Sequence, residues 1–180
     1  MSVAISSIFV LMLENRSFDH MLGFSGISGT DAVSGKPRPA NGLSGTESNK
    51  LQGRSFPVTQ PADAAMPVDP GHEFTDTLIQ LCGPGTTYQP GGSYPPIDNS
   101  GFVSNYASHA SNKFSDIMKC FSAAQLPVLN ALAKNFAVCD GWYASMPGPT
   151  FPNRFFACAA SSERVRGSLS SSLGTEAGRC

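Results

Sequence analysis

The 180-residue sequence lacks an excess of charge of either sign, a long hydrophobic run and closely spaced cysteine pairs. Charged residues make up only 14% of it, and 12 basic and 13 acidic side chains give a net charge of -1. This balance offers no electrostatic basis for binding nucleic acid or an anionic membrane surface. We therefore expect no nucleic acid among its partners.

The strongly apolar stretch at residues 8–13 is far too short to cross a bilayer, which takes about 20 residues in a helix. It also does not fit the core of a signal peptide. No basic segment precedes it, no small-residue cleavage site follows it, and it continues directly into Glu14 and Asn15. We predict no transmembrane segment and no export signal, and hence a cytoplasmic location.

The five cysteines are an odd number, widely spaced and without a CxxC pair, which excludes a zinc ribbon or a dense disulfide scaffold. Cys120 and Cys139 lie in apolar surroundings, and we expect both to be buried as small hydrophobic residues.

The apolar fraction of 41% and the length fit one globular domain of the α/β class. Val, Ile, Phe and Leu dominate residues 3–13, as expected of a central strand covered on both faces. Ser17 can cap a short helix that ends at Gly23. Three further helices are predicted, over residues 69–81, 102–109 and 126–135, and a short strand over 136–139.

In the helix over 126–135, the predicted buried stripe consists of Val128, Leu129, Leu132 and Phe136. Two long loops, over 24–68 and 83–101, are rich in Gly, Ser and Pro, and loops of this length are uncommon unless they serve a site. The periodic pattern ends after residue 161, so we expect 1–161 to be the domain and 162–180 a disordered tail.

The stretch from Pro147 to Arg154 places a hydroxyl group at a predicted helix start. Pro152 suits a first helical position, and an apolar face follows it. Thr150 would then lie where free backbone N–H groups and the positive end of the helix dipole favour a phosphate. A metal ion could stabilise its alkoxide as a nucleophile. The simpler alternative is an ordinary threonine cap.

Glu14 and Asn15 follow the predicted strand, at the edge where α/β sheets usually assemble ligand sites. Their oxygens suit a divalent metal ion, although two ligands do not complete a site. Alternatively, Glu14 pairs with Arg16 and Asn15 caps the next helix.

Three other side chains could act on a phosphate ester. His72 could donate to a phosphoryl oxygen or protonate a leaving group, or it could be structural. Asn153 and Arg154 could hydrogen-bond phosphate oxygens, the latter in a bidentate way, or Arg154 could be a surface charge. Asp19 and Asp140 are candidates for supporting or capping roles.

Taken together, residues 10–20, 69–72 and 126–154 resemble the phosphoesterase family that contains bacterial phospholipases C and related acid phosphatases. The most specific strings are Glu-Asn-Arg-Ser-Phe-Asp at 14–19 and Gly-Pro-Thr-Phe-Pro-Asn-Arg at 148–154. The resemblance spans roughly residues 4–161 in the same order. It implies an alkaline-phosphatase-like α/β sandwich with a central, mainly parallel sheet, of which this chain holds the N-terminal part.

The resemblance also implies roles for individual residues. Glu14 and Asn15 align with the family's metal-binding pair, Thr150 with its nucleophile, and His72 with an active-site histidine. The expected activity is hydrolysis of a phosphoric ester, either a phospholipid or a soluble monoester, with a divalent metal ion of unknown identity. Thr150 would be both nucleophile and metal ligand.

The sequence departs from the family in length, because members carry further aspartate and histidine ligands in a second half that has no counterpart here. Two hypotheses follow. The first is a phosphoric ester hydrolase, truncated relative to the family. The second is a non-catalytic fragment that folds partly or binds phosphate without turnover.

Overall fold

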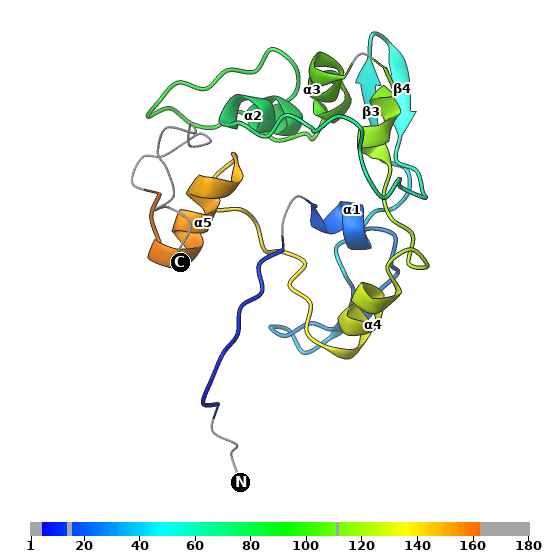
Figure 1. Ribbon diagram of the computed structural model, residues 1–180, viewed down its shortest axis with the longest axis vertical. Helices are drawn as coiled ribbons and strands as arrows, with labels where there is room; N and C mark the ends of the chain where they lie inside the picture. The colour runs from blue at the N-terminus through cyan, green and yellow to red at the C-terminus, as the bar shows by residue number, and fades with distance from the viewer. Residues whose placement is uncertain (1–4, 14–15, 111, 163–180) are drawn as a thin grey trace.

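A computed structural model describes residues 5–13, 16–110 and 112–162 (Figure 1). These residues form a mixed α/β structure of short elements. In chain order the elements are α1 (Phe18–Leu22), β1 (Ser28–Thr30), β2 (Pro37–Pro39), β3 (Ser48–Leu51), β4 (Arg54–Pro57), α2 (Phe74–Cys82), α3 (Phe102–His109), the 3-10 helix η1 (Phe114–Met118), α4 (Pro127–Asn135) and α5 (Thr150–Ala159). Among the described residues, no helix has both the length and the apolar character needed to cross a bilayer.

The strands pair as two antiparallel hairpins, β1 with β2 and β3 with β4. Both hairpins lie within residues 24–68, where the sequence predicted only a loop, because three- and four-residue strands leave too short a pattern to recognise. A single parallel bridge joins Thr59 to Lys119. The predicted central parallel sheet is therefore not confirmed in the described part of the chain.

The hydrophobic core forms around α3. Val103 is completely buried, and it packs with Phe56 of β4 and Met118 of η1. The side chain of Asn49 ties β3 to this helix, since its Oδ1 accepts a hydrogen bond from the Val103 N–H at 3.2 Å. Its Nδ2 donates to the Asn99 carbonyl at 2.9 Å. Consequently α2, α3, η1 and the β3–β4 hairpin form one packed unit in the upper part of Figure 1.

The helix predictions that rest on local capping signals are confirmed. Helix α1 begins after Ser17, whose side chain accepts a hydrogen bond from the His20 N–H, and ends at Gly23. Helix α3 covers the predicted residues, and α4 begins at Pro127. Helix α2 starts later than predicted, because Glu73 and Asp76 form a capping box that fixes its first turn at Phe74.

Residues 5–13 are the main departure from the predicted fold. They carry no regular secondary structure and run away from the rest of the molecule in Figure 1. Phe9 is 95% exposed and Leu11 82% exposed. The prediction of a buried strand here is not met in the structure, because a strand needs neighbours for its backbone hydrogen bonds and none of the described segments pairs with this one.

The predicted burial of α4 is also wrong in part. Its polar Asn130 faces inward and is buried, while Val128, Leu132 and Phe136 of the predicted stripe are exposed. Periodicity correctly identified an apolar face, but it does not show whether a neighbouring element covers that face.

Three smaller predictions also have outcomes. Cys120 is buried as expected, whereas Cys139 is exposed. Residues 136–139 form no strand, and residues 83–101 are irregular as predicted. The tail predicted over 162–180 lies, except for Ser162, outside the described residues.

Candidate functional site

Thr150 is the first residue of α5, with Pro149 as the N-cap. The helix therefore begins two residues before Pro152, which lies buried in the first turn where its missing N–H costs no hydrogen bond. The Thr150 side chain is half-buried, and none of the described residues forms a hydrogen bond with its hydroxyl. A ten-residue helix thus presents a hydroxyl at its positive end, as the sequence predicts.

The side chain of Asn153 organises the turn that precedes Thr150. Its Oδ1 accepts a hydrogen bond from the Met146 N–H at 3.2 Å. Its Nδ2 lies 3.2 Å from the carbonyl oxygens of Met146 and Gly148 and 3.1 Å from that of Pro149. Both polar atoms of the Asn153 side chain thus bond to the backbone of residues 146–149. The predicted contact of this side chain with a phosphate stays a prediction.

The other two side chains predicted to act on a phosphate ester, His72 and Arg154, are both exposed. His72 is exposed, and its Nδ1 lies 3.2 Å from the Pro70 carbonyl oxygen and 3.6 Å from Asp69 Oδ2. Arg154 is exposed on α5. Among the described residues, no hydrogen bond or ion pair joins His72 to Thr150 or to Asn153.

The predicted metal pair, Glu14 and Asn15, lies outside the described residues. Within the described ranges, no three His, Cys, Asp or Glu side chains come close enough together to hold a metal ion. The described donors therefore do not make a metal site by themselves.

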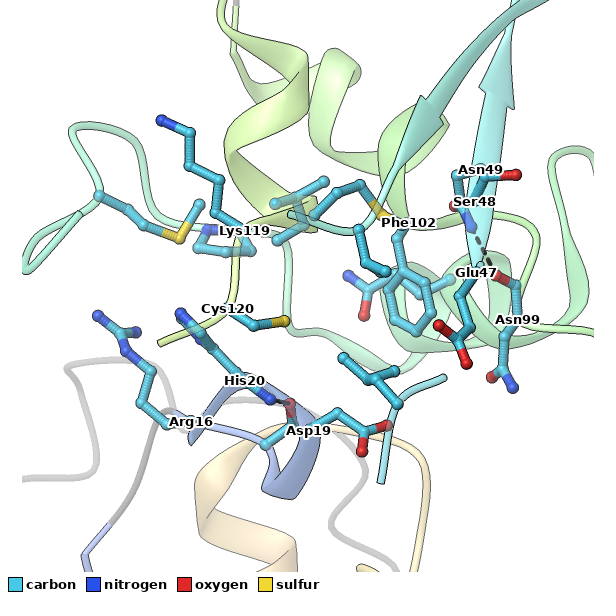
Figure 2. A pocket seen from close by; sticks show the side chains of 18 of the residues that line it. Arg16, Asp19, His20, Glu47, Ser48, Asn49, Asn99, Phe102, Lys119 and Cys120 are labelled. Carbon is cyan, nitrogen blue, oxygen red and sulfur yellow. Dashed lines mark hydrogen bonds between the residues drawn. The ribbon is translucent and has the colours of Figure 1, made fainter. Parts of the chain in front are cut away.

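A cavity of about 670 Å³ opens beside α1, directly after the Glu14–Asn15 pair in the sequence (Figure 2). Arg16, Asp19 and His20 contribute from the α1 side, and Glu47 and Cys120 from the opposite side. Its volume lies in the range typical of small-molecule sites, about 300–1,000 Å³. Thr150, His72, Asn153 and Arg154 do not line it.

The ionisable groups around this cavity influence one another. Burial and the nearby Glu47 raise the pKa of Asp19, while burial and Arg16 lower that of His20. The pKa of Glu47 is lowered to about 2, chiefly by the backbone N–H of Ser44. Burial, together with Asp19 and Glu47, raises the pKa of the Cys120 thiol to about 11, so this cysteine is protonated and unreactive at neutral pH.

Among the described residues, packing and not a hydrogen bond holds the His20 ring. It stacks on Phe121 with the ring centroids 4.9 Å apart and the planes 11° from parallel. The Phe121 N–H also donates to the His20 carbonyl at 2.8 Å. The imidazole is therefore fixed at the edge of the cavity, three residues after Ser17, the serine that caps its helix.

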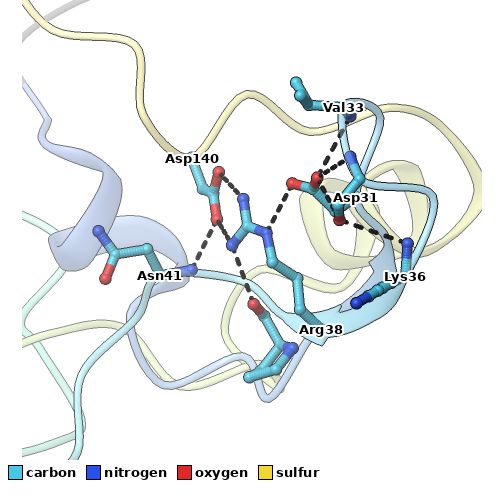
Figure 3. A network of polar contacts seen from close by, with 8 residues as sticks. Asp31, Val33, Lys36, Arg38, Asn41 and Asp140 are labelled. Atoms are coloured by element: carbon cyan, nitrogen blue, oxygen red, sulfur yellow. Dashed lines mark hydrogen bonds and ion pairs between the residues drawn. The ribbon is translucent and has the colours of Figure 1, made fainter.

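A second polar cluster anchors the segment that leads to Thr150 (Figure 3). The Arg38 guanidinium forms two hydrogen bonds with Asp140, at 2.8 and 2.9 Å, and one with Asp31 at 2.9 Å. Asp140 also accepts from the Asn41 N–H at 2.7 Å. This cluster, the Arg38 clamp, fastens the first half of the α4–α5 connection to the β1–β2 hairpin.

Sequence reasoning identified residues 14–19, part of which lines the cavity, and residues 148–154, which contain the helix start. It missed several other residues that build the cavity and its surroundings. Glu47 and Cys120 come from distant parts of the chain, and nothing in their local sequence marks them as cavity residues. The Arg38–Asp140 pair is separated by 102 positions. Asp140 was a candidate supporting residue, and the structure gives it a cationic partner.

Comparison with known proteins places this chain in a family. The model of the phosphoesterase family matches residues 5–178. Non-specific phospholipase C6 of Arabidopsis thaliana is 37% identical over 159 residues, which cover 88% of this chain and 28% of that protein. Non-specific phospholipase C3 of Arabidopsis thaliana is 38% identical over 162 residues, covering 88% of this chain and 30% of the relative.

A bacterial relative gives a similar result. Phospholipase C B of Mycobacterium tuberculosis (strain ATCC 25618 / H37Rv) is 32% identical over 162 residues, covering 84% of this chain and 29% of that protein. The chain thus spans less than one third of the length of these curated relatives. The family match covers both the segment that lines the cavity and the helix start at Thr150, and we conclude that the chain belongs to the phosphoesterase family.

Proposed function

We propose that this chain carries part of the active site of a phosphoric ester hydrolase of the phospholipase C type, with Thr150 as the nucleophile. The observation that supports this most directly is the placement of the Thr150 hydroxyl at the start of α5, without a hydrogen-bond partner in the described part of the chain. A hydroxyl at a helix N-terminus is well placed to attack a phosphorus atom whose oxygens the free backbone N–H groups bind.

In the proposed reaction, Thr150 Oγ1 attacks phosphorus in line with the ester oxygen and releases its hydroxyl proton to solvent. The P–O bond to the leaving alcohol breaks, and that alcohol takes up a proton, for which His72 is the proposed donor. Water then attacks the phosphorus of the phospho-threonine intermediate, releasing the phosphate product and restoring the hydroxyl. For a phospholipid the leaving alcohol would be diacylglycerol, and for a soluble monoester the product would be inorganic phosphate.

Glu14, Asn15 and Thr150 are the proposed ligands of a divalent metal ion, which would neutralise negative charge on the phosphate and the alkoxide when bound. This part of the proposal rests on the two sequence segments at 14–19 and 148–154 that resemble the family. The central parallel sheet, the domain limit at residue 161 and a cytoplasmic location belong to the same proposal, since each rests on the sequence alone.

The contacts of the Asn153 side chain give a second, independent argument for Thr150 as the nucleophile. Four hydrogen bonds hold the Met146–Pro149 turn against the first turn of α5. Fixing this turn fixes the backbone from which Thr150 projects, and a nucleophile needs such fixed placement. Asn153 is thus proposed as a positioning residue in addition to its predicted phosphate contact.

A second candidate function is phosphate binding without turnover. It is favoured by the finding that Thr150 and His72 do not line the large cavity beside Arg16 and Asp19. In this case the chain would bind a phosphate ester but would not bring the nucleophile to it.

Hydrolysis of p-nitrophenyl phosphate by the purified 180-residue chain, with and without added divalent metal ions, separates the two functions. The proposed hydrolase requires metal-dependent turnover that falls by roughly a thousandfold or more in Thr150→Ala. Thr150→Ser keeps the hydroxyl and should retain activity. Phosphate binding in a titration, with equal background rates for both variants, would contradict the hydrolase and support the binding function.

A further inference from the structure

The segment that carries His72 is irregular, but its backbone is held on both sides of the histidine by side chains of α2. The Gly71 carbonyl, in the peptide group before His72, accepts a hydrogen bond from Gln80 Nε2 at 2.6 Å. The N–H of Glu73, in the peptide group after it, donates to Asp76 Oδ2 at 3.2 Å. Because both peptide groups next to His72 are bound to one helix, the direction in which its side chain leaves the backbone is restricted.

A buried amide on α3 joins these two anchors. Asn105 is only 4% exposed, and its Oδ1 accepts a hydrogen bond from Gln80 Nε2 at 2.8 Å. Its Nδ2 donates to Asp76 Oδ1, also at 2.8 Å. Gln80, Asn105 and Asp76 therefore form one connected polar network between α2 and α3, and a buried network whose members are all bonded is rigid.

The backbone of Gly71 lies directly against this network. Gly71 is buried, and a side chain at this position would collide with the side chains of Asp76 and His109. The His109 ring is part of the same contact, since its Nε2 lies 3.1 Å from Asp76 Oδ1. Only a glycine permits this close approach, so the residue that precedes His72 is held by packing as well as by its hydrogen bond.

The His72 ring makes its polar contacts through one nitrogen. Its Nδ1 lies near the Pro70 carbonyl oxygen and the Asp69 carboxylate, and both groups only accept hydrogen bonds. Nδ1 therefore carries a proton, and in the neutral ring Nε2 holds the lone pair. The side chain is 58% exposed, and none of the described residues forms a hydrogen bond with Nε2.

We propose that Gln80, Asn105 and Asp76 are positioning residues that direct Nε2 of His72 toward the phosphate ester. The inference rests on the proposed function, in which His72 donates a proton to the leaving alcohol. The protonated ring would give its Nε2 proton to the leaving oxygen. The neutral ring that remains is the tautomer protonated at Nδ1, which the Pro70 carbonyl already binds.

The first test is the ring tautomer of His72, measured by 15N NMR of the 180-residue chain with His72→Gln to assign the signals. At about pH 8.5, where histidines are ordinarily neutral, the wild-type ring should be protonated at Nδ1 and not at Nε2. Gln80→Glu keeps the length of the side chain but replaces the N–H donor by an acceptor. The Gly71 carbonyl is then released, and the ring should become a mixture of both tautomers.

Asn49→Ala is the matched control. It removes another buried amide of the same packed unit, together with two hydrogen bonds, and neither of these bonds involves the segment that carries His72. A general loss of stability would affect both variants, whereas the proposal requires that only Gln80→Glu changes the tautomer. An unchanged tautomer in Gln80→Glu, or an equal change in Asn49→Ala, would overturn the proposal. Gln80→Ala replaces Gln80→Glu if the latter does not fold.

Inorganic phosphate separates the positioning from the proposed function. It should shift the Nε2 signal of the wild-type chain, and the uncharged variant Gln80→Ala should bind it roughly tenfold or more weakly. If the chain turns over p-nitrophenyl phosphate, Gln80→Ala should lower kcat more than it changes KM. A fixed tautomer without any response to phosphate and without turnover would leave the anchoring of His72 in place and contradict its role in hydrolysis.

Discussion

The region from β3 to η1 buries its apolar side chains, whereas two segments outside it, residues 5–13 and α4, leave theirs exposed. Between β3 and η1, Val103, Phe56 and Met118 pack together, and buried amides such as Asn49 satisfy backbone groups inside the unit. In residues 5–13 and in α4, comparable side chains are exposed. The first region contains its own packing partners, whereas the second displays apolar surface that the described residues do not cover.

This difference separates the stability of the chain from its chemistry. Thr150, the proposed nucleophile, begins α5 outside the packed unit, and the proposed metal pair, Glu14 and Asn15, directly follows residues 5–13 in the sequence. The packed unit and these three residues therefore belong to different parts of the sequence.

The strongest test of this contrast compares two phenylalanines. Phe56→Ala removes a buried ring from the core and should lower the free energy of unfolding by about 3–5 kcal/mol. Phe136→Ala removes a ring that is 71% exposed and should change it by about 0.5 kcal/mol or less. Urea unfolding followed by far-ultraviolet circular dichroism measures both. Similar losses in the two variants would show that α4 is covered in solution.

A smaller effect is expected at the border between the regions, where Asn153 holds the turn before Thr150. Asn153→Ala should cost about 1–3 kcal/mol locally, because the turn loses all four hydrogen bonds of this partly buried side chain. Hydrogen exchange at the Met146 amide should accelerate by roughly tenfold or more. Asn153→Asp retains an oxygen for this amide and should preserve part of its protection.

Unchanged exchange at Met146 in Asn153→Ala would contradict the positioning role. If that variant lost only its affinity for inorganic phosphate, Asn153 would instead act by contact with the ligand.

The smallest effect is expected at the Arg38 clamp. Hydrogen bonds from Arg38, and then from the Asn41 N–H, lower the pKa of Asp140 from 3.8 to about 2. Because the folded-state pKa is the lower one, ionised Asp140 stabilises the clamp above about pH 4, and this contribution is lost as the pH falls toward 2. An NMR titration of the Asp140 carboxyl should show a midpoint near the lower value, and Arg38→Ala should return it toward 3.8.

Lys36→Ala is the control for this titration, since it removes a positive charge of the same hairpin connection whose ammonium group does not bond to Asp140 among the described residues. A midpoint that moves equally in Lys36→Ala and Arg38→Ala would mean that general charge, and not the bidentate contact, sets the pKa.

Local signals in the sequence predicted much of the helical structure. Ser17 and Gly23 delimit α1, and Pro127 marks the start of α4, because caps and prolines act on the backbone within one turn. The helix start at Thr150 was predictable for the same reason. These features depend on neighbours in the sequence and not on the rest of the fold.

Contacts between distant segments were not predictable in this way. Asn49 bonds to the backbone of Val103, 54 positions away, and nothing in the spacing of either residue indicates the other. The apolar run at 8–13 correctly indicates a segment that needs covering, but periodicity contains no information on whether the cover is present in the same 180 residues. The apolar pattern of this segment was read correctly, but the predicted strand does not form because none of the described segments pairs with it.

The only tryptophan of the chain, Trp142, lies in the α4–α5 connection, 84% exposed and two residues after Asp140 of the Arg38 clamp. Its emission therefore reports on the solvent around this connection and not on the core near Val103. Intrinsic fluorescence would remain that of a hydrated indole while the core melts, and it would shift to shorter wavelength when another surface covers the approach to Thr150. The chain thus contains a natural optical label for assembly, at a position where that label is nearly blind to unfolding.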